Sequence, residues 1–196
     1  ETVSEEQRQK SKDGFVVEQV DGIEGWSGIG MMAVANTRVV RRSAALMEQN
    51  QKSYGNNFTF GEHGLFSTKR MARLASYGSI LAFLVIGTPL KYLVRPFLLK
   101  PGQGPSQETQ DKGWFRATFV AHSEDNERKI CSMYGSGDPG YKSTAKMVCE
   151  SAIALARSND LPGGREYGGV LTSAVGLGNV LIDRLKAAEI EFKVIS

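Results

Sequence analysis

The pattern of hydrophobic and polar positions in the first third of the chain predicts two strands followed by a helix. Residues 15–20 form a short apolar run that ends at Asp21-Gly22, a turn signal. Residues 23–34 are rich in glycine, which predicts a returning strand with a bulge or a close backbone approach. In residues 37–51, apolar side chains recur at the spacing of one helix face. These helical positions are Val40, Ala44 and Met47.

Two apolar runs in the second half of the chain predict a β-hairpin. Residues 114–121 and 128–134 flank a polar turn at 123–127. The other expected elements are a strand at 58–60, helices at 141–157 and 177–188, and a closing strand at 192–195. One face of the helix at 141–157 carries Ala145, Val148, Cys149, Ala152 and Ala156. Hairpins mixed with helices indicate an α+β fold, with a mixed or antiparallel sheet and packed helices.

The middle of the chain is an apolar segment followed by a linker. Residues 74–90 carry no charged side chain, and residues 80–86 are strongly apolar, which predicts an apolar helical segment. A linker rich in proline and glycine comes next at 101–105, and Ser106 is suited to cap a short polar helix. The expected domain organisation is a polar tail at 1–13, one domain made of 14–73 and 113–196, and the apolar segment with its linker at 74–112.

This apolar segment is expected to contact a membrane or lipid surface without spanning it. A spanning helix needs about 20 predominantly apolar residues, whereas the uncharged run ends at Leu90 and is succeeded by Lys91 and Arg95, with prolines at 89 and 96. Basic residues on both sides suit anionic headgroups. The candidate membrane-contacting side chains are Leu81, Phe83, Leu84, Ile86, Tyr92 and Phe97. A core helix packed against the sheet is the open alternative, since so short a run also suits burial.

Composition and charge narrow the functional classes. The chain has 196 residues, of which 41% are hydrophobic and 23% charged, as in ordinary globular proteins. Its formal charge of +3 and its scattered basic residues do not indicate nucleic-acid binding. The polar first 13 residues are unlike a signal peptide and start at Glu1, so a fragment or a processed product is expected.

Cysteine and histidine form no pattern typical of a metal site. Cys131 and Cys149 belong to no CxxC motif, which predicts reduced, buried thiols. His63 and His122 lack the spacing of metal ligands. No metal site is therefore expected, and no residue is indicated as catalytic.

Two glycine-rich stretches approach nucleotide-binding motifs but lack their context. Residues 28–33 fit G-x-G-x-x-A, yet no continuous apolar strand precedes them, so a glycine-rich hairpin is favoured. Residues 135–143 approach a phosphate-binding loop, but Tyr141 separates the last glycine from Lys142. The chain itself is expected to bind no cofactor.

A series of short motifs, each weak alone, is specific in its order and spacing. The series comprises Arg38-Val39-Val40-Arg41-Arg42-Ser43, Tyr54-Gly55 with Phe58 and Phe60, Gly104-Pro105-Ser106, Gly113-Trp114-Phe115, Gly137-Asp138-Pro139-Gly140-Tyr141-Lys142, Glu150-Ser151-Ala152, Gly169-Val170-Leu171-Thr172, and Gly178 with Leu181-Ile182 and Arg184-Leu185. Through them, the chain from about Val34 to Val194 resembles the saccharopine dehydrogenase-like oxidoreductases, close to their trans-acting enoyl reductase-like branch. In that family a Rossmann domain that binds NAD(P) precedes this region. The resemblance therefore implies a C-terminal half whose N-terminal Rossmann domain is absent from this chain.

The glycine loop at 135–140 supplies the candidate site. Asp138 can cap the following helix with Pro139 at its first position. Gly140 allows a close backbone approach, and Tyr141 and Lys142 would project from the first helical turn. One interpretation places these residues at a substrate or interdomain cleft. The other is that the loop only caps the helix.

The predicted function is the substrate-side or packing domain of an NAD(P)-dependent oxidoreductase, with lipid-linked substrates as one option. The alternative is a non-enzymatic module associated with membranes or lipid droplets. Expected partners are the missing Rossmann domain, a membrane or lipid surface on the cytosolic face, and a second copy in a homo-oligomer.

Overall fold

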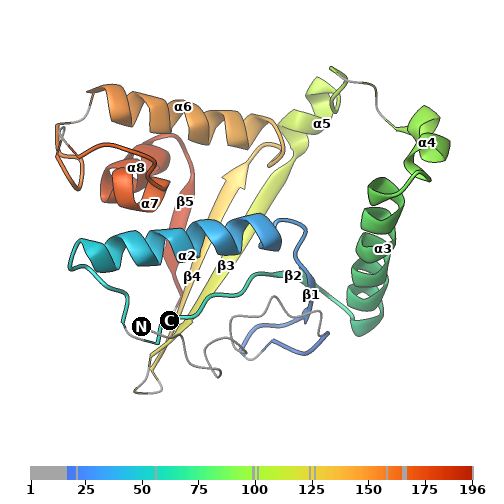
Figure 1. Ribbon diagram of the computed structural model, residues 1–196, viewed down its shortest axis with the longest axis horizontal. Coiled ribbons are helices and arrows are strands. Elements are labelled where there is room, and N and C mark those ends of the chain that lie inside the picture. Colours follow the sequence, from blue (N-terminus) through green and yellow to red (C-terminus); the bar gives the residue numbers. More distant parts are fainter. Residues whose placement is uncertain are drawn as a thin grey trace. The chain divides into compact units, whose positions relative to one another are not determined.

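The computed structural model describes residues 17–20, 22–55, 57–98, 100, 102–123, 125, 127–157, 159–164 and 167–195. The predicted polar tail at 1–13 and the first two residues of the predicted strand at 15–20 lie outside these described residues. The chain divides into two compact units, Glu1–Lys100 and Pro101–Ser196, and each is described by itself. Both units combine helices with an antiparallel sheet, so the predicted α+β class is confirmed (Figure 1).

The first unit contains a two-stranded antiparallel sheet. Strand β1 (Trp26–Ile29) pairs with β2 (His63–Phe66), with Trp26 opposite Phe66 and Ile29 opposite His63. Helix α2 (Ala33–Gln49) lies between them in sequence and confirms the helix predicted at 37–51, which begins four residues earlier than expected. Its N-terminal turn is tied to the segment before β2, because the Asn36 side-chain amide donates to a Glu62 carboxylate oxygen at 2.7 Å.

Of two strand predictions for this unit, one is confirmed in part and one was wrong. The expected return strand at 23–34 forms at Trp26–Ile29, where Trp26 makes an antiparallel bridge with Gln19, whereas residues 33–34 already belong to α2. The expected strand at 58–60 is irregular, and the strand forms at β2 instead. The centre of the Phe58 ring lies 5.1 Å from that of the Tyr54 ring, so Phe58 makes a local aromatic contact here and not a strand pairing.

The predicted apolar helical segment is confirmed as helix α3 (Lys69–Gly87), followed by α4 (Lys91–Val94) and the 3-10 turn η1 (Arg95–Phe97). Thr68 caps α3, because its hydroxyl oxygen accepts a hydrogen bond from the Met71 amide. Small residues let the start of α3 approach β1 closely. The Ser76 hydroxyl accepts from the Ile29 amide at 3.0 Å and lies next to Gly28, where a side chain would collide with it.

The second unit contains a three-stranded antiparallel sheet in the order β3-β4-β5. Its elements are α5 (Gln107–Lys112), β3 (Trp114–His122), β4 (Arg128–Ser136), α6 (Lys142–Arg157), α7 (Ser173–Gly176), α8 (Gly178–Ala187) and β5 (Glu191–Val194). The predicted hairpin, both predicted helices and the closing strand are confirmed. In the hairpin, Trp114 lies opposite Ser136 and Val120 opposite Ile130.

The core of this unit forms where the sheet meets the segment between α8 and β5. Ile190 is almost fully buried, and its side chain reaches Gly135 of β4 beside the ring of Phe115. Helices α6 and α8 are joined by an ion pair between Arg184 and Glu150 at 2.7 Å. Their pairing leaves Val148 of the apolar α6 face exposed, contrary to what its periodicity suggests. Cys149 on this face is exposed too, so the expectation of a buried thiol was wrong there; Cys131 is half-buried.

Candidate functional site

The glycine loop connects β4 to α6 through a turn at residues 138–141. Gly137 has a φ of 95°, a backbone conformation that favours glycine. A carboxylate oxygen of Asp138 then accepts a hydrogen bond from the Tyr141 amide at 2.8 Å. This bond closes the turn at residues 138–141, and α6 begins after that turn, at Lys142. Asp138 therefore caps the turn that leads into α6, and Pro139 lies in this turn and not at the first position of the helix.

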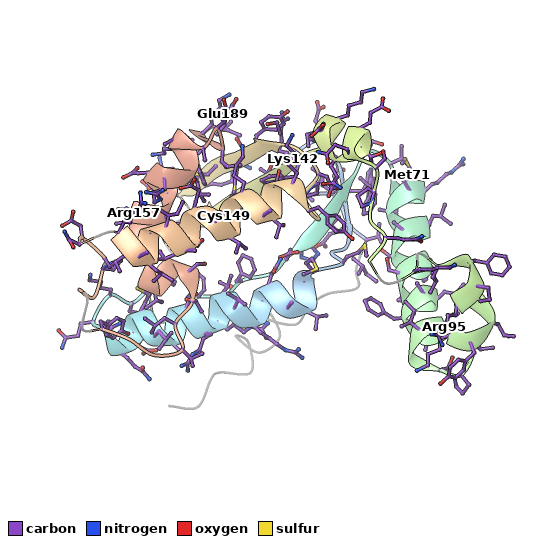
Figure 2. The ribbon with its side chains drawn as sticks, turned by 90° about the horizontal axis from the view of Figure 1, so that it is seen from above. Met71, Arg95, Lys142, Cys149, Arg157 and Glu189 are labelled. Carbon is purple, nitrogen blue, oxygen red and sulfur yellow. The ribbon has the colours of Figure 1, made fainter. Side chains whose placement is uncertain are left out.

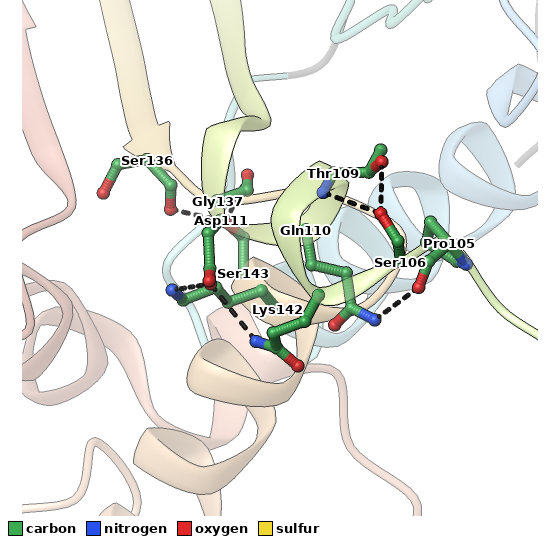
Figure 3. Close-up of polar contacts among 10 residues, drawn as sticks. Pro105, Ser106, Thr109, Gln110, Asp111, Ser136, Gly137, Lys142 and Ser143 are labelled. Carbon is green, nitrogen blue, oxygen red and sulfur yellow. Dashed lines mark hydrogen bonds and ion pairs between the residues drawn. The ribbon is translucent and has the colours of Figure 1, made fainter.

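Ser143, in the first turn of α6, holds the glycine loop through its side chain. Its side chain is fully buried, and its hydroxyl lies 3.0 Å from both the Ser136 and the Gly137 carbonyl oxygens. Two residues that are consecutive at the end of β4 are therefore held by one side chain (Figure 3).

Helix α5 and Gly113, which lie between the linker and β3, contact the same loop. The Gly137 amide donates to the Gly113 carbonyl at 2.7 Å, and the Asp138 amide donates to the Gln110 carbonyl at 2.8 Å. A Cβ atom at Gly113 would lie 2.6 Å from the backbone of Asp138, so only glycine fits there without a shift. The Gln110 side chain in turn donates to the Pro105 carbonyl at 2.9 Å, which folds the linker onto helix α5 (Figure 3).

Tyr141 and Lys142 also contact this linker. The Tyr141 ring lies beside Gly104 and is about half exposed. The Lys142 ammonium donates to a carboxylate oxygen of Asp111 at 2.5 Å, and both side chains are 47% exposed. The hydrogen bond from Lys142, followed by one from Gln107, holds the pKa of Asp111 below its usual value of 3.8.

The N-terminal end of α6 therefore holds all four candidate residues, which are Asp138, Gly140, Tyr141 and Lys142. A cavity of about 370 Å³ lies elsewhere, in the first unit, and none of these four lines it. Its lining residues are Val17, Ile29, Arg73, Ser76, Tyr77 and Ile80. Among the described residues, no three His, Cys, Asp or Glu side chains are grouped as metal ligands.

The G-x-G-x-x-A stretch has a structural explanation that involves no nucleotide. A Cβ atom at Gly28 would lie 2.8 Å from the Phe66 ring and 3.0 Å from the Ser76 hydroxyl. The amide of Ile29 is also occupied, because it donates to the Ser76 hydroxyl. A dinucleotide cradle requires free amides and open space at these positions, so the residues present do not fit one. The favoured glycine-rich hairpin is confirmed only in part: β1 makes an antiparallel bridge with the preceding segment, Gln19 opposite Trp26, but the stretch then leads into α2.

Comparison with known proteins shows which proteins this chain resembles in sequence. A trans-acting enoyl reductase of Mycobacterium tuberculosis (strain ATCC 25618 / H37Rv) is 32% identical over 172 residues, which is 83% of this chain and 40% of that protein. A trans-acting enoyl reductase of Mycobacterium ulcerans (strain Agy99) is 32% identical over 169 residues, or 82% of this chain and 39% of that protein. The chain is homologous to trans-acting enoyl reductases.

The chain spans about two fifths of the length of these curated trans-acting enoyl reductases. No protein-family model matches it. No solved structure matches it either.

The structure brings several of the scattered motifs of the sequence to a common location. Gly104-Pro105-Ser106, Gly113 and the stretch from Gly137 to Lys142 all meet at the loop. Glu150 and Arg184, from two further motifs, pair with each other.

Sequence reasoning missed the buried Ser143 and, before β3, Gln110 and Asp111 of α5 with Gly113 at its end. Gly113 carried a usable signal, since a glycine directly before a strand can mark a close backbone approach. Asp111 and Lys142 are 31 positions apart, and no local pattern connects them.

Proposed function

We propose that this chain is the substrate-side domain of an NAD(P)-dependent oxidoreductase that reduces enoyl groups. The observation that carries the proposal is the 32% identity to trans-acting enoyl reductases along more than four fifths of the chain. Because the chain spans only two fifths of those relatives, the cofactor-binding part is assigned to a separate Rossmann domain. The non-enzymatic alternative is not favoured, since the relatives are named as enzymes.

Reduction of an enoyl group adds a hydride and a proton across a carbon–carbon double bond. Bound NAD(P)H supplies the hydride, and the stretch from Gly28 to Ala33 offers it no cradle. We therefore assign to the chain the binding and orientation of the substrate. Tyr141 and Lys142 are the residues proposed to reach the cleft, because both are about half exposed at the start of α6.

The rigid support of this turn favours a positioning role. Asp138, Ser143 and the linker amide contacts hold the loop from three directions. Residues that orient a substrate need such support, because small misplacements of reacting groups are costly in rate. Lipid-linked enoyl chains are the proposed substrate class.

Calorimetric titration of the 196-residue chain with NADH and NADPH tests whether the cofactor is bound by another domain. The expected result is no binding in the micromolar range by the chain alone. Micromolar binding to the isolated chain would overturn the assignment of the cofactor to another domain. A variant with Ser76→Ala, which frees the Ile29 amide, would then show whether the stretch from Gly28 to Ala33 holds the nucleotide.

A further inference from the structure

An arm made of the second half of α3, α4 and η1 exposes apolar side chains on all sides. This apolar arm comprises residues 80–98. Its larger side chains are Ile80, Leu81, Phe83, Leu84, Ile86, Leu90, Tyr92, Leu93, Phe97 and Leu98, which are between 37% and 89% exposed. From residue 80 to residue 87 no polar side chain interrupts the helix, so this half of α3 has no face suited to water. A helix that is apolar all round belongs in a protein core or in a membrane.

The charges around the apolar arm have one sign. Between Glu62 and Glu108 the sequence holds no acidic residue, whereas Lys69, Arg70 and Arg73 precede the arm and Lys91 and Arg95 lie within it. Figure 2 shows side chains extending outward along this part of the chain, between the labelled Met71 and Arg95. Cations at both ends of an apolar surface are complementary to anionic lipid headgroups.

The same charges argue against a second copy as the occupant. A two-fold interface brings the same patch of both copies together. Two copies of the arm would bring together surfaces whose charged residues, Lys91 and Arg95, are all cationic, with no acidic residue of the segment to compensate. Like charges across an interface suppress such pairing.

The length of the arm limits how deep it can reach. α3 is long and apolar enough to be a candidate membrane span by length and composition. However, its charge-free part, residues 74–87, is only about 21 Å long at 1.5 Å per residue, against about 30 Å of hydrocarbon in a bilayer. The start of α3 is also held against β1 by the Ser76 hydrogen bond.

At the far end of α3, the Thr88 amide and hydroxyl both donate to the Val85 carbonyl, at 3.4 and 3.3 Å, so this carbonyl of the last turn is satisfied. Unsatisfied backbone groups are costly in lipid. Lys91 and Arg95 have long aliphatic stems that can lie along the hydrocarbon while their charges stay among the headgroups.

We propose that the apolar arm inserts into one leaflet of an anionic bilayer and does not span it. Leu81, Phe83, Leu84 and Ile86 enter the acyl region. Lys91 and Arg95 bind the headgroups from the same side, and both units of the chain stay on that side.

Flotation of the full chain with lipid vesicles tests this. The chain is expected to float with vesicles of phosphatidylcholine containing about one third phosphatidylserine, and about tenfold or more weakly with phosphatidylcholine alone. Changing the four arm side chains Leu81, Phe83, Leu84 and Ile86 to serine should weaken binding by about a hundredfold or more. The matched control is Val148→Ser with Leu155→Ser on α6, whose side chains are 61% and 62% exposed, like Phe83 and Leu81. The control should float as the unchanged chain does.

A charge variant keeps the test decisive if the serine variant fails to fold. Lys91→Glu with Arg95→Glu changes only exposed side chains and should reduce flotation with anionic vesicles by about tenfold or more. Absence of flotation by the unchanged chain, or equal flotation with neutral vesicles, would overturn the proposal. A concentration-dependent dimer that the serine variant abolishes would instead assign the arm to a second copy.

Protease protection distinguishes insertion into one leaflet from spanning. When the chain is synthesised in the presence of microsomes, added protease should digest both units. Protection of either unit would mean that the arm crosses the membrane and would refute the proposed topology.

Discussion

Replacing Gly113 by alanine adds one methyl group at the point where the linker touches the glycine loop. The backbone angles of Gly113, φ −63° and ψ 161°, are ordinary for alanine, so the substitution creates no conformational strain of its own. The new Cβ would, however, lie 2.6 Å from both the amide nitrogen and the Cα of Asp138. The effect of the variant is therefore steric.

The expected cost depends on the atoms that have to move. An ordinary carbon contact requires a separation of about 3.5 Å, so Gly113 and the loop must part by roughly one ångström. That movement stretches the two hydrogen bonds from Gly137 to Gly113 and from Asp138 to Gln110. Overpacking together with weakened backbone bonds should lower the free energy of unfolding by about 2–3 kcal/mol. For a unit of this size, that corresponds to a fall in Tm of about 10–20 °C.

Urea unfolding monitored by tryptophan fluorescence measures this cost. The chain has two tryptophans, so in a Trp26→Phe background Trp114 alone reports on the second unit. The matched control is Gly168→Ala, because a Cβ there meets nothing within 4 Å. Gly168→Ala should change stability by less than about 0.5 kcal/mol. If Gly113→Ala and Gly168→Ala unfold at the same urea concentration, the linker does not close on the loop as described.

Two further predictions concern the same loop. Asp138→Ala should cost about 1 kcal/mol of stability through the lost N-cap, while Asp138→Asn should retain most of it; equal loss in both variants, by urea unfolding, would contradict the capping role. The pKa of Asp111 is lowered chiefly by the hydrogen bond from Lys142, so this pair stabilises the fold above the ordinary pKa of 3.8 and the contribution is lost as the pH falls through the lower, folded value. In Lys142→Met, the carboxyl NMR titration of Asp111 should move up toward 3.8; an unchanged titration would show that the ion pair does not form in solution.

The sequence predicted the second unit better than the first. The hairpin, α6, α8 and the closing strand agree with local periodicity, and the two hairpin strands are adjacent in sequence. β2 was not predicted because its four residues, His63 to Phe66, include a glycine and show only weak alternation of apolar and polar side chains. Its partner β1 lies more than 30 residues earlier, so the pairing depends on contacts that no local pattern reveals.

The candidate site was predicted in part, for the same reason. Asp138 and Pro139 form a local capping signal, and the Asp138 carboxylate does accept the Tyr141 amide, although the helix begins only at Lys142. The linker contacts through Gln110, Asp111 and Gly113 are tertiary, and the sequence did not reveal them. The apolar face of α6 was visible in the pattern, but periodicity identifies a face and does not say what covers it. Val148 on that face is exposed.

Turnover of the complete gene product tests the central claim, that this chain positions an enoyl substrate for an NAD(P)-dependent reduction. The measurement is oxidation of NADPH and NADH in the presence of enoyl substrates, with Tyr141→Ala plus Lys142→Ala as the variant. Asp111→Asn is the control, because it breaks the ion pair with Lys142 and leaves the side chains of Tyr141 and Lys142 in place. The account predicts enoyl-dependent oxidation that falls in the double variant, with little change in Tm and near-normal turnover in the control. A folded complete protein that oxidises neither nucleotide with any enoyl substrate would contradict the proposed activity, and unchanged turnover in the double variant would contradict the proposed site.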